Sequence, residues 1–115
     1  MNSLDLDLAY RDADKLKASG KYQEAIEKLL DILKVDPAFT MAHLGLAVCY
    51  GKLGDHLSAV KYGESAVQID PQDPFGYTAL SVTYLRAFDG TQDRKFIGLA
   101  EEAKARGQML AGHMH

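Results

Sequence analysis

Three side chains in the middle of the chain are of the types that form a nucleophile and its base: His43, Cys49 and His56. A catalytic thiolate needs an imidazole within hydrogen-bonding reach and a third group that orients this imidazole. The sequence Gly-Lys-Leu-Gly at residues 51–54 reads as a turn that separates Cys49 from His56, and no third group is in view. We therefore expect Cys49 to pack inside the protein, and the sequence does not predict an enzyme.

Candidate ligands for a metal or a phosphate group are sparse. His113 and His115 lie at the end of the chain, and two histidines fall short of the four ligands of a closed zinc site. Glu101 and Glu102 are adjacent, so on a helix they point in different directions and belong to a solvated face. The sequence contains no glycine-rich phosphate loop. It therefore predicts no metal site and no cofactor.

Composition and charge argue against several classes of partner. A chain of 115 residues is enough for one compact domain, and 47% hydrophobic with 25% charged residues is ordinary for a globular protein. The net charge of -3 provides no overall attraction for a nucleic acid. Apolar runs are short, and acids stand in the first residues where an export signal carries bases. We expect a cytoplasmic protein that binds neither nucleic acid nor membrane.

Two segments, residues 20–37 and 54–71, repeat the same residue types at the same spacing. Four matches stand 34 positions apart: Gly20 with Gly54, Ala25 with Ala59, Asp36 with Asp70, and Pro37 with Pro71. A fixed period of 20 to 50 residues is typical of arrays of stacked supersecondary units. Around each glycine a helical pattern ends and another begins, and the second pattern ends before Asp-Pro because proline disfavours α conformation in the preceding residue. Each unit is therefore predicted to be a helical hairpin.

The periodicity predicts an all-α protein of about six helices. The expected helices cover residues 3–19, 22–35, 40–52, 56–69, 75–88 and 93–109. Asp73 and Pro74 form a favourable N-cap and first-turn pair for the fifth of them. We expect this fifth helix to run to about Asp89, with Gly90 ending it in the left-handed conformation.

These features resemble the tetratricopeptide repeat family, whose unit is a 34-residue helix–turn–helix with a small residue midway in its first helix and a proline at its end. The small position is Ala13, Ala47 and Ser81, and the larger residue three places later is Leu16, Tyr50 and Tyr84. The resemblance implies a right-handed superhelical solenoid of antiparallel helix pairs. Its repeats would cover about residues 6–39, 40–73 and 74–110, with the third degenerate. We expect a single domain over residues 1–110 and a flexible C-terminal tail at 111–115.

In this family the first helix of each hairpin lines the concave face. By resemblance, the candidate partner-binding residues in this chain are Tyr10, Met41, Leu44, Val48, Lys52, Phe75, Thr78, Val82, Leu85 and Arg86. Most of the central ones are apolar, and an exposed apolar patch of several hundred Å² on a monomer commonly marks an interaction site. Lys52 and Arg86 either form a basic edge of this groove or offset the partial negative charge at the end of their own helices.

Three ways of covering this apolar surface compete. In the first, the chain is a non-enzymatic module that binds a peptide or protein segment in the groove. In the second, it is a self-assembling scaffold module that forms a homodimer through the groove or the uncapped last helix. In the third, neighbouring helices bury these residues on one another within one chain.

One subtype of the family is excluded by the residues themselves. Repeats that clamp the C-terminal carboxylate of chaperone tails carry Lys, Asn and Arg at five inward positions, where this chain has Tyr10, Asp14, Gly45, Phe75 and Ala79. A carboxylate in this groove would lack the cations and amides that hold it in that subtype. We therefore do not predict a chaperone-tail clamp.

Overall fold

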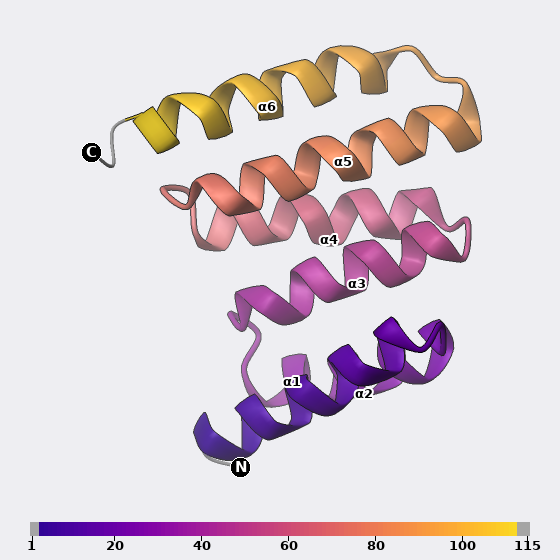
Figure 1. Ribbon diagram of the computed structural model, residues 1–115, viewed down its shortest axis with the longest axis vertical. Coiled ribbons are helices and arrows are strands. Elements are labelled where there is room, and N and C mark those ends of the chain that lie inside the picture. Colours follow the sequence, from indigo (N-terminus) through magenta and orange to yellow (C-terminus); the bar gives the residue numbers. More distant parts are fainter. Residues whose placement is uncertain (1–2, 113–115) are drawn as a thin grey trace.

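The computed structural model describes residues 3–112 and contains six helices in that range, with no strand (Figure 1). The helices are α1 (Ser3–Ala18), α2 (Tyr22–Val35), α3 (Thr40–Lys52), α4 (His56–Ile69), α5 (Pro74–Thr91) and α6 (Lys95–Gly112). The predicted all-α architecture is confirmed. The bounds of α2, α3 and α4 are those expected from the sequence.

The first two hairpins turn at glycines. Gly20 has φ +77° and Gly54 has φ +83°, a conformation that costs little only for a residue without a Cβ. At the other end of each hairpin, the backbone N–H groups of Asp36 and Asp70 close the last turns of α2 and α4 on Ile32 and Ala66. The glycine and Asp-Pro signals therefore act as predicted from the sequence.

The third hairpin departs from this pattern. Phe88 occupies the place of Gly20 and Gly54, and α5 continues through Gly90 to Thr91, so the expectation that Gly90 ends the helix is wrong. The left-handed residue is Gln92, with φ 61°, and its N–H bonds to the carbonyl of Phe88. Helix α6 begins two residues later than expected and runs to Gly112, into the segment expected to be a tail.

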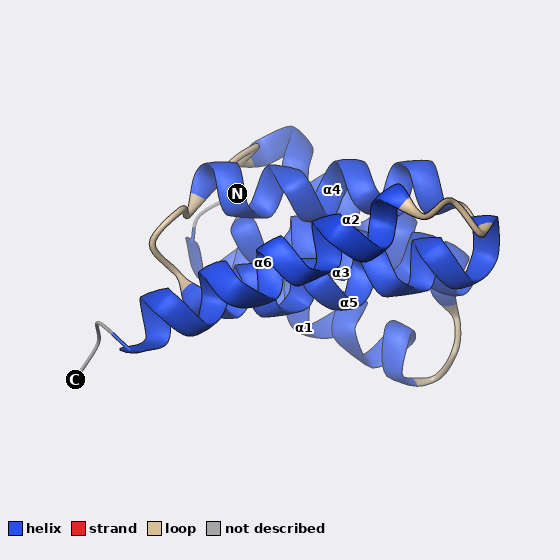
Figure 2. Ribbon diagram, turned by 90° about the horizontal axis from the view of Figure 1, so that it is seen from above, coloured by secondary structure: helices blue, strands red, loops and turns tan. Residues whose placement is uncertain are grey.

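The six helices form two layers that bend toward one side. The molecule measures 38 × 36 × 21 Å, and its short dimension equals two helices of about 10 Å each. Helix α3 contacts both α1 and α5, whereas no Cα pair within 8 Å joins α4 to α2 or to α6 in residues 3–112. In a bent two-layer stack, the layer whose helices lie closer to one another is the inner layer. The layer of α1, α3 and α5 therefore faces the concave side (Figures 1 and 2).

Two hydrophobic clusters hold the stack together. The first joins α1, α2 and α3 around Ile26, Leu29, Ile32 and Leu46, and the second joins α4, α5 and α6 around Tyr84 and Phe96. Alanines at the helix crossings are almost completely buried, which allows the backbones to approach closely.

Gly90 has a packing role in place of the expected helix-ending one. The imidazole of His56, at the first turn of α4, lies so close to Gly90 that a Cβ at this position would overlap it. We predict that Gly90→Ala lowers the melting temperature measured by circular dichroism. Gly98→Ala, in an open position of α6, should instead stabilise the protein by roughly 0.5–1 kcal/mol through helix propensity.

The control for this prediction removes the imidazole. In a His56→Ala background the overlap is gone, and Gly90→Ala should then stabilise like Gly98→Ala. Equal stabilisation by both substitutions in the wild-type background would show that the contact between His56 and Gly90 does not constrain the chain.

Candidate functional site

The concave face exposes large apolar side chains. Met41 on α3 is 42% exposed, and Phe75, Val82 and Leu85 on α5 are 57%, 44% and 49% exposed. Val48 is half-buried, and Leu44 alone among the apolar candidates is buried. Neighbouring helices therefore leave most of this surface exposed. This excludes the third alternative left open by the sequence, in which the helices of one chain bury these residues on one another.

An open cavity of about 270 Å³ lies among α3, α4 and α5. Its lining is mostly apolar: Leu44, Ala47, Val48, Gly63, Phe75, Thr78, Ala79, Leu80, Val82, Thr83 and Arg86. Gly63 lets α4 approach closely, since a Cβ there would stand 3.0 Å from the Cδ1 atom of Leu80. A concave, mainly apolar cavity with few polar groups is the usual form of a binding site.

The cavity brings together six of the ten candidate residues: Leu44, Val48, Phe75, Thr78, Val82 and Arg86. It does not include Met41, Lys52, Leu85 or Tyr10. Five other lining residues were missed by the sequence reasoning: Ala47, Gly63, Ala79, Leu80 and Thr83. Ala47, Ala79 and Thr83 are each next to a candidate in the sequence, and Leu80 lies midway between Thr78 and Val82. Gly63 belongs to α4, a helix that the inward pattern did not include.

Arg86 is the one charged residue that lines the cavity. Because α5 continues to Thr91, Arg86 does not lie in the last turn of its own helix. Its side chain instead runs along the end of α3, where a Cβ on Gly51 would contact the Cδ atom of Arg86 at 3.8 Å. Lys52 is exposed in the last turn of α3, where a cation offsets the partial negative charge of that helix.

The N-terminal end of the concave face is more polar. The ring of Tyr10 packs against Phe39 at a centroid distance of 6.0 Å, and burial raises the pKa of the Tyr10 phenol. Lys17 forms an ion pair with Asp14 at 3.1 Å on the same helix. These contacts are internal to the first repeat, and Tyr10 does not line the cavity.

The three candidate catalytic side chains have different surroundings. Cys49 has no exposed surface, and burial raises the pKa of its thiol. The Nε2 atom of His43 lies 2.8 Å from the carbonyl oxygen of Pro37, and the ring of His43 packs beside Tyr62. His56 packs against Gly90. Cys49 and His43 are therefore packing residues, as expected for Cys49 from the sequence.

Residues 3–112 contain no group of three or more His, Cys, Asp or Glu side chains that could hold a metal ion. His113 and His115 lie outside the described residues. No helix in the described part of the chain is long and apolar enough to cross a membrane.

Comparison with known families identifies the repeat. A family model described as tetratricopeptide repeat matches residues 10–74, more than half of the chain, and the match spans the hairpins around Gly20 and Gly54. The chain belongs to the tetratricopeptide repeat family. Membership agrees with the 34-residue spacing and with the two-layer stack of helices.

Two curated relatives share modest identity with this tetratricopeptide repeat chain. The photosystem I assembly protein Ycf3 of Rippkaea orientalis is 28% identical over 101 residues, which are 84% of this chain and 56% of that protein. The Hsp70-Hsp90 organizing protein 3 of Arabidopsis thaliana is 27% identical over 86 residues, or 73% of this chain and 15% of that protein. The chain thus spans about half of the first relative and a small part of the second.

Two solved structures show the same fold. The type III secretion translocator chaperone SycD of Yersinia enterocolitica has a TM-score of 0.71 and 23% identity, covering 90% of this chain and 79% of SycD. PcrH, solved in complex with the chaperone binding region of PopD, has a TM-score of 0.65 and 16% identity, covering 100% of this chain and 97% of PcrH.

The environment of Cys49 leads to a test of its reactivity. We predict that the native thiol reacts with a water-soluble aromatic disulfide at least about a hundredfold more slowly than the thiol of the urea-unfolded chain. The native thiol reacts only when the core of α1, α2 and α3 opens. Each 1.4 kcal/mol of opening free energy therefore lowers its reaction rate about tenfold. Absorbance of the released thiolate measures both rates. Similar rates in the two states would contradict a packing role for Cys49.

Proposed function

We propose that this chain is a non-enzymatic interaction module that binds a segment of another protein on its concave face. The observation that carries the proposal is the group of exposed apolar side chains of α3 and α5 beside an open cavity of about 270 Å³. Apolar surface gathered on one face is costly in water, and a bound segment that covers it would gain free energy in proportion to the area buried.

The polar groups of the cavity define the chemistry of the partner. The hydroxyl groups of Thr78 and Thr83 donate to the carbonyl oxygens of Pro74 and Ala79 within α5, so their protons are already used inside the helix. Arg86 remains as the cation at one end of the cavity. A fitting segment therefore presents apolar anchors to Leu44, Val48 and Phe75 and a carboxylate to Arg86.

The comparisons support an interaction role. PcrH, which has the same fold, was solved with a region of PopD bound to it, and SycD is described as a translocator chaperone. Ycf3 and the organizing protein are described by their roles in assembly and in organizing Hsp70 and Hsp90. Each of these roles requires contact with another protein. We infer the same class of activity for this chain, with a partner set by its own cavity.

Selection from a displayed library of random peptides tests the proposal without a known partner. We expect enrichment of sequences with spaced apolar residues and one acid. Phe75→Glu should lower the affinity for the selected peptides at least about tenfold, because it places an unpaired carboxylate in the apolar lining. Arg86→Ala should lower the affinity only for those peptides that carry the acidic residue. Fluorescence anisotropy of labelled peptides measures these changes.

A matched control comes from α4. Leu57 is the second residue of α4, just as Phe75 is the second residue of α5, and it is 81% exposed on a different face. Leu57→Glu adds the same charge at the same kind of helix position and should leave peptide affinity unchanged. Failure to enrich any peptide family, or equal losses in the Phe75→Glu and Leu57→Glu proteins, would refute binding in the concave cavity.

The second candidate is a homodimer that covers the same apolar face. The exposed residues on α3 and α5 would serve a second copy as well as a peptide, and SycD was solved as an alternative dimer. Sedimentation velocity over a hundredfold range of concentration separates the two proposals. For the dimer we expect a concentration-dependent sedimentation coefficient that Phe75→Glu abolishes. A concentration-independent monomer would rule it out.

A further inference from the structure

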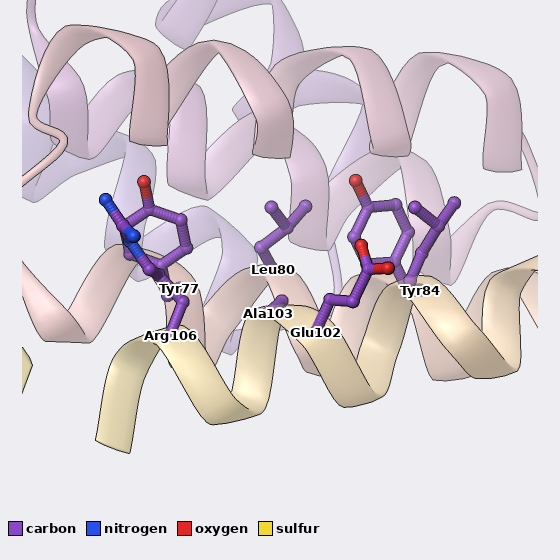
Figure 3. A pocket seen from close by; sticks show the side chains of 7 residues that line it. Tyr77, Leu80, Tyr84, Glu102, Ala103 and Arg106 are labelled. Atoms are coloured by element: carbon purple, nitrogen blue, oxygen red, sulfur yellow. The ribbon is translucent and has the colours of Figure 1, made fainter. Parts of the chain in front are cut away.

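A second open cavity of about 270 Å³ lies on another side of α5, between α5 and α6 (Figure 3). Its lining consists of Tyr77, Leu80, Tyr84, Leu99, Glu102, Ala103 and Arg106. In Figure 3 the rings of Tyr77 and Tyr84 stand on either side of Leu80, with both hydroxyl groups pointing the same way. This convex cavity shares only Leu80 with the concave cavity.

The second repeat shows what fills the corresponding place there. Tyr77 and Tyr84 correspond, 34 positions earlier, to His43 and Tyr50. Between those two rings lies the ring of Tyr62 from α4, with centroids 5.8 Å from His43 and 5.7 Å from Tyr50, and its plane is within 4° of parallel to that of Tyr50. We call the space between these two side chains of one helix the slot. In the second repeat, therefore, the ring of Tyr62 from α4 fills the slot over α3.

In the third repeat this position holds a smaller side chain. The buried residues Ala59, Gly63 and Ala66 of α4 have the same spacing as Phe96, Ala100 and Ala103 of α6, which are 37 positions later. The shift exceeds 34 because α5 is extended at its C-terminal end. In this register Tyr62 corresponds to Leu99. A leucine thus stands where the second repeat has a ring, and this difference leaves the convex cavity open.

The dimensions of the slot suit one ring. Residues seven apart on a helix are about 10.5 Å apart along its axis, so a ring inserted midway contacts the side chains on both sides, as Tyr62 does. An apolar cavity of about 150 Å³ is known to hold benzene, and this one is larger. Leu80 and Leu99 supply apolar walls, and Tyr77 and Tyr84 supply aromatic ones.

Contacts made by the lining side chains hold the slot in shape. The hydroxyl of Tyr84 donates to a carboxylate oxygen of Glu64 on α4, and its ring packs on Phe96 at a centroid distance of 6.1 Å. The guanidinium of Arg106 lies 5.9 Å from the centroid of Tyr77. A ring that enters would find these walls already in place, which lowers the entropic cost of binding.

The charges at the rim favour a neutral ring that belongs to a polypeptide. Glu102 and Arg106 lie one helical turn apart on α6, are exposed, and carry opposite charges. Because the two charges offset each other, the rim offers no net attraction to a ring that carries a charge of either sign. Because the rim is exposed, a main chain can continue past the slot in both directions and use both charges. This combination suits Phe, Tyr or Trp within a protein segment.

We propose that the convex cavity receives a neutral aromatic side chain of a partner protein, which takes the place that Tyr62 fills in the second repeat. The site is separate from the proposed concave site, since a different face of α5 lines it. The chain would then contact partners on both faces of its third repeat.

The chain contains no tryptophan, so the fluorescence of a tryptophan probe can be followed without background from that residue. The probe is a capped peptide of glycines with one central tryptophan, and its fluorescence anisotropy is measured while protein is added. We expect saturable binding to the wild-type protein. Leu99→Tyr, which should fill the slot from within as Tyr62 does, should lower the association constant at least about tenfold.

Reciprocal and matched variants complete the experiment. Tyr62→Leu should open the corresponding slot over α3 and add a second binding site. Phe75→Glu in the concave cavity should leave binding of the tryptophan probe unchanged, so the two proposals fail independently. Leu99→Phe serves as the second filling variant if circular dichroism shows that the Leu99→Tyr protein is not folded.

Three results would overturn the proposal. The first is equal binding by the wild-type protein and a folded filling variant. The second is equal binding of a peptide with leucine in place of tryptophan, because the slot would then not select a ring. The third is binding of free indole without binding of the peptide, because the slot would then exclude a polypeptide.

Discussion

The helices of this protein pack against one another at alanines and glycines, and the close approach at these positions determines where the larger side chains lie. Ala13, Ala25 and Ala59 have almost no exposed surface, and a Cβ on Gly63 would press on Leu80. With the backbones this close, bulky residues gather in two clusters or remain exposed at the surface. A larger side chain at a crossing would separate two helices along their whole length and so alter the curvature of the stack.

Helix α5 illustrates this constraint best, because two different faces of it line cavities. Phe75, Val82 and Arg86 lie on the concave side, whereas Tyr77 and Tyr84 lie on the convex side and Leu80 borders both. The helix also extends past the point where the earlier hairpins turn, which moves Arg86 away from the helix end and shifts the register of α6. One local difference, Phe88 in place of a glycine, thus accompanies the features that distinguish the third repeat.

Much of the fold could be predicted from the sequence because its signals are local. Gly20, Gly54 and the two Asp-Pro pairs act within one turn of the residues they affect, so α2, α3 and α4 begin and end as expected. The prediction was wrong for Gly90, whose role depends on His56, a residue far away in the sequence. Six candidate groove residues line one cavity, while Tyr10 is occupied by a contact with Phe39 that the inward pattern did not reveal.

The sequence by itself determined the 34-residue period and the helical hairpins, since both follow from residue spacing along the chain. Only the tertiary structure decided how tightly the stack bends, which apolar side chains remain exposed, and that the slot filled by Tyr62 is open beside Leu99. These properties are distances between side chains on different helices. The periodicity of a single helix contains no information about such distances, because they depend on how every crossing in the stack is packed.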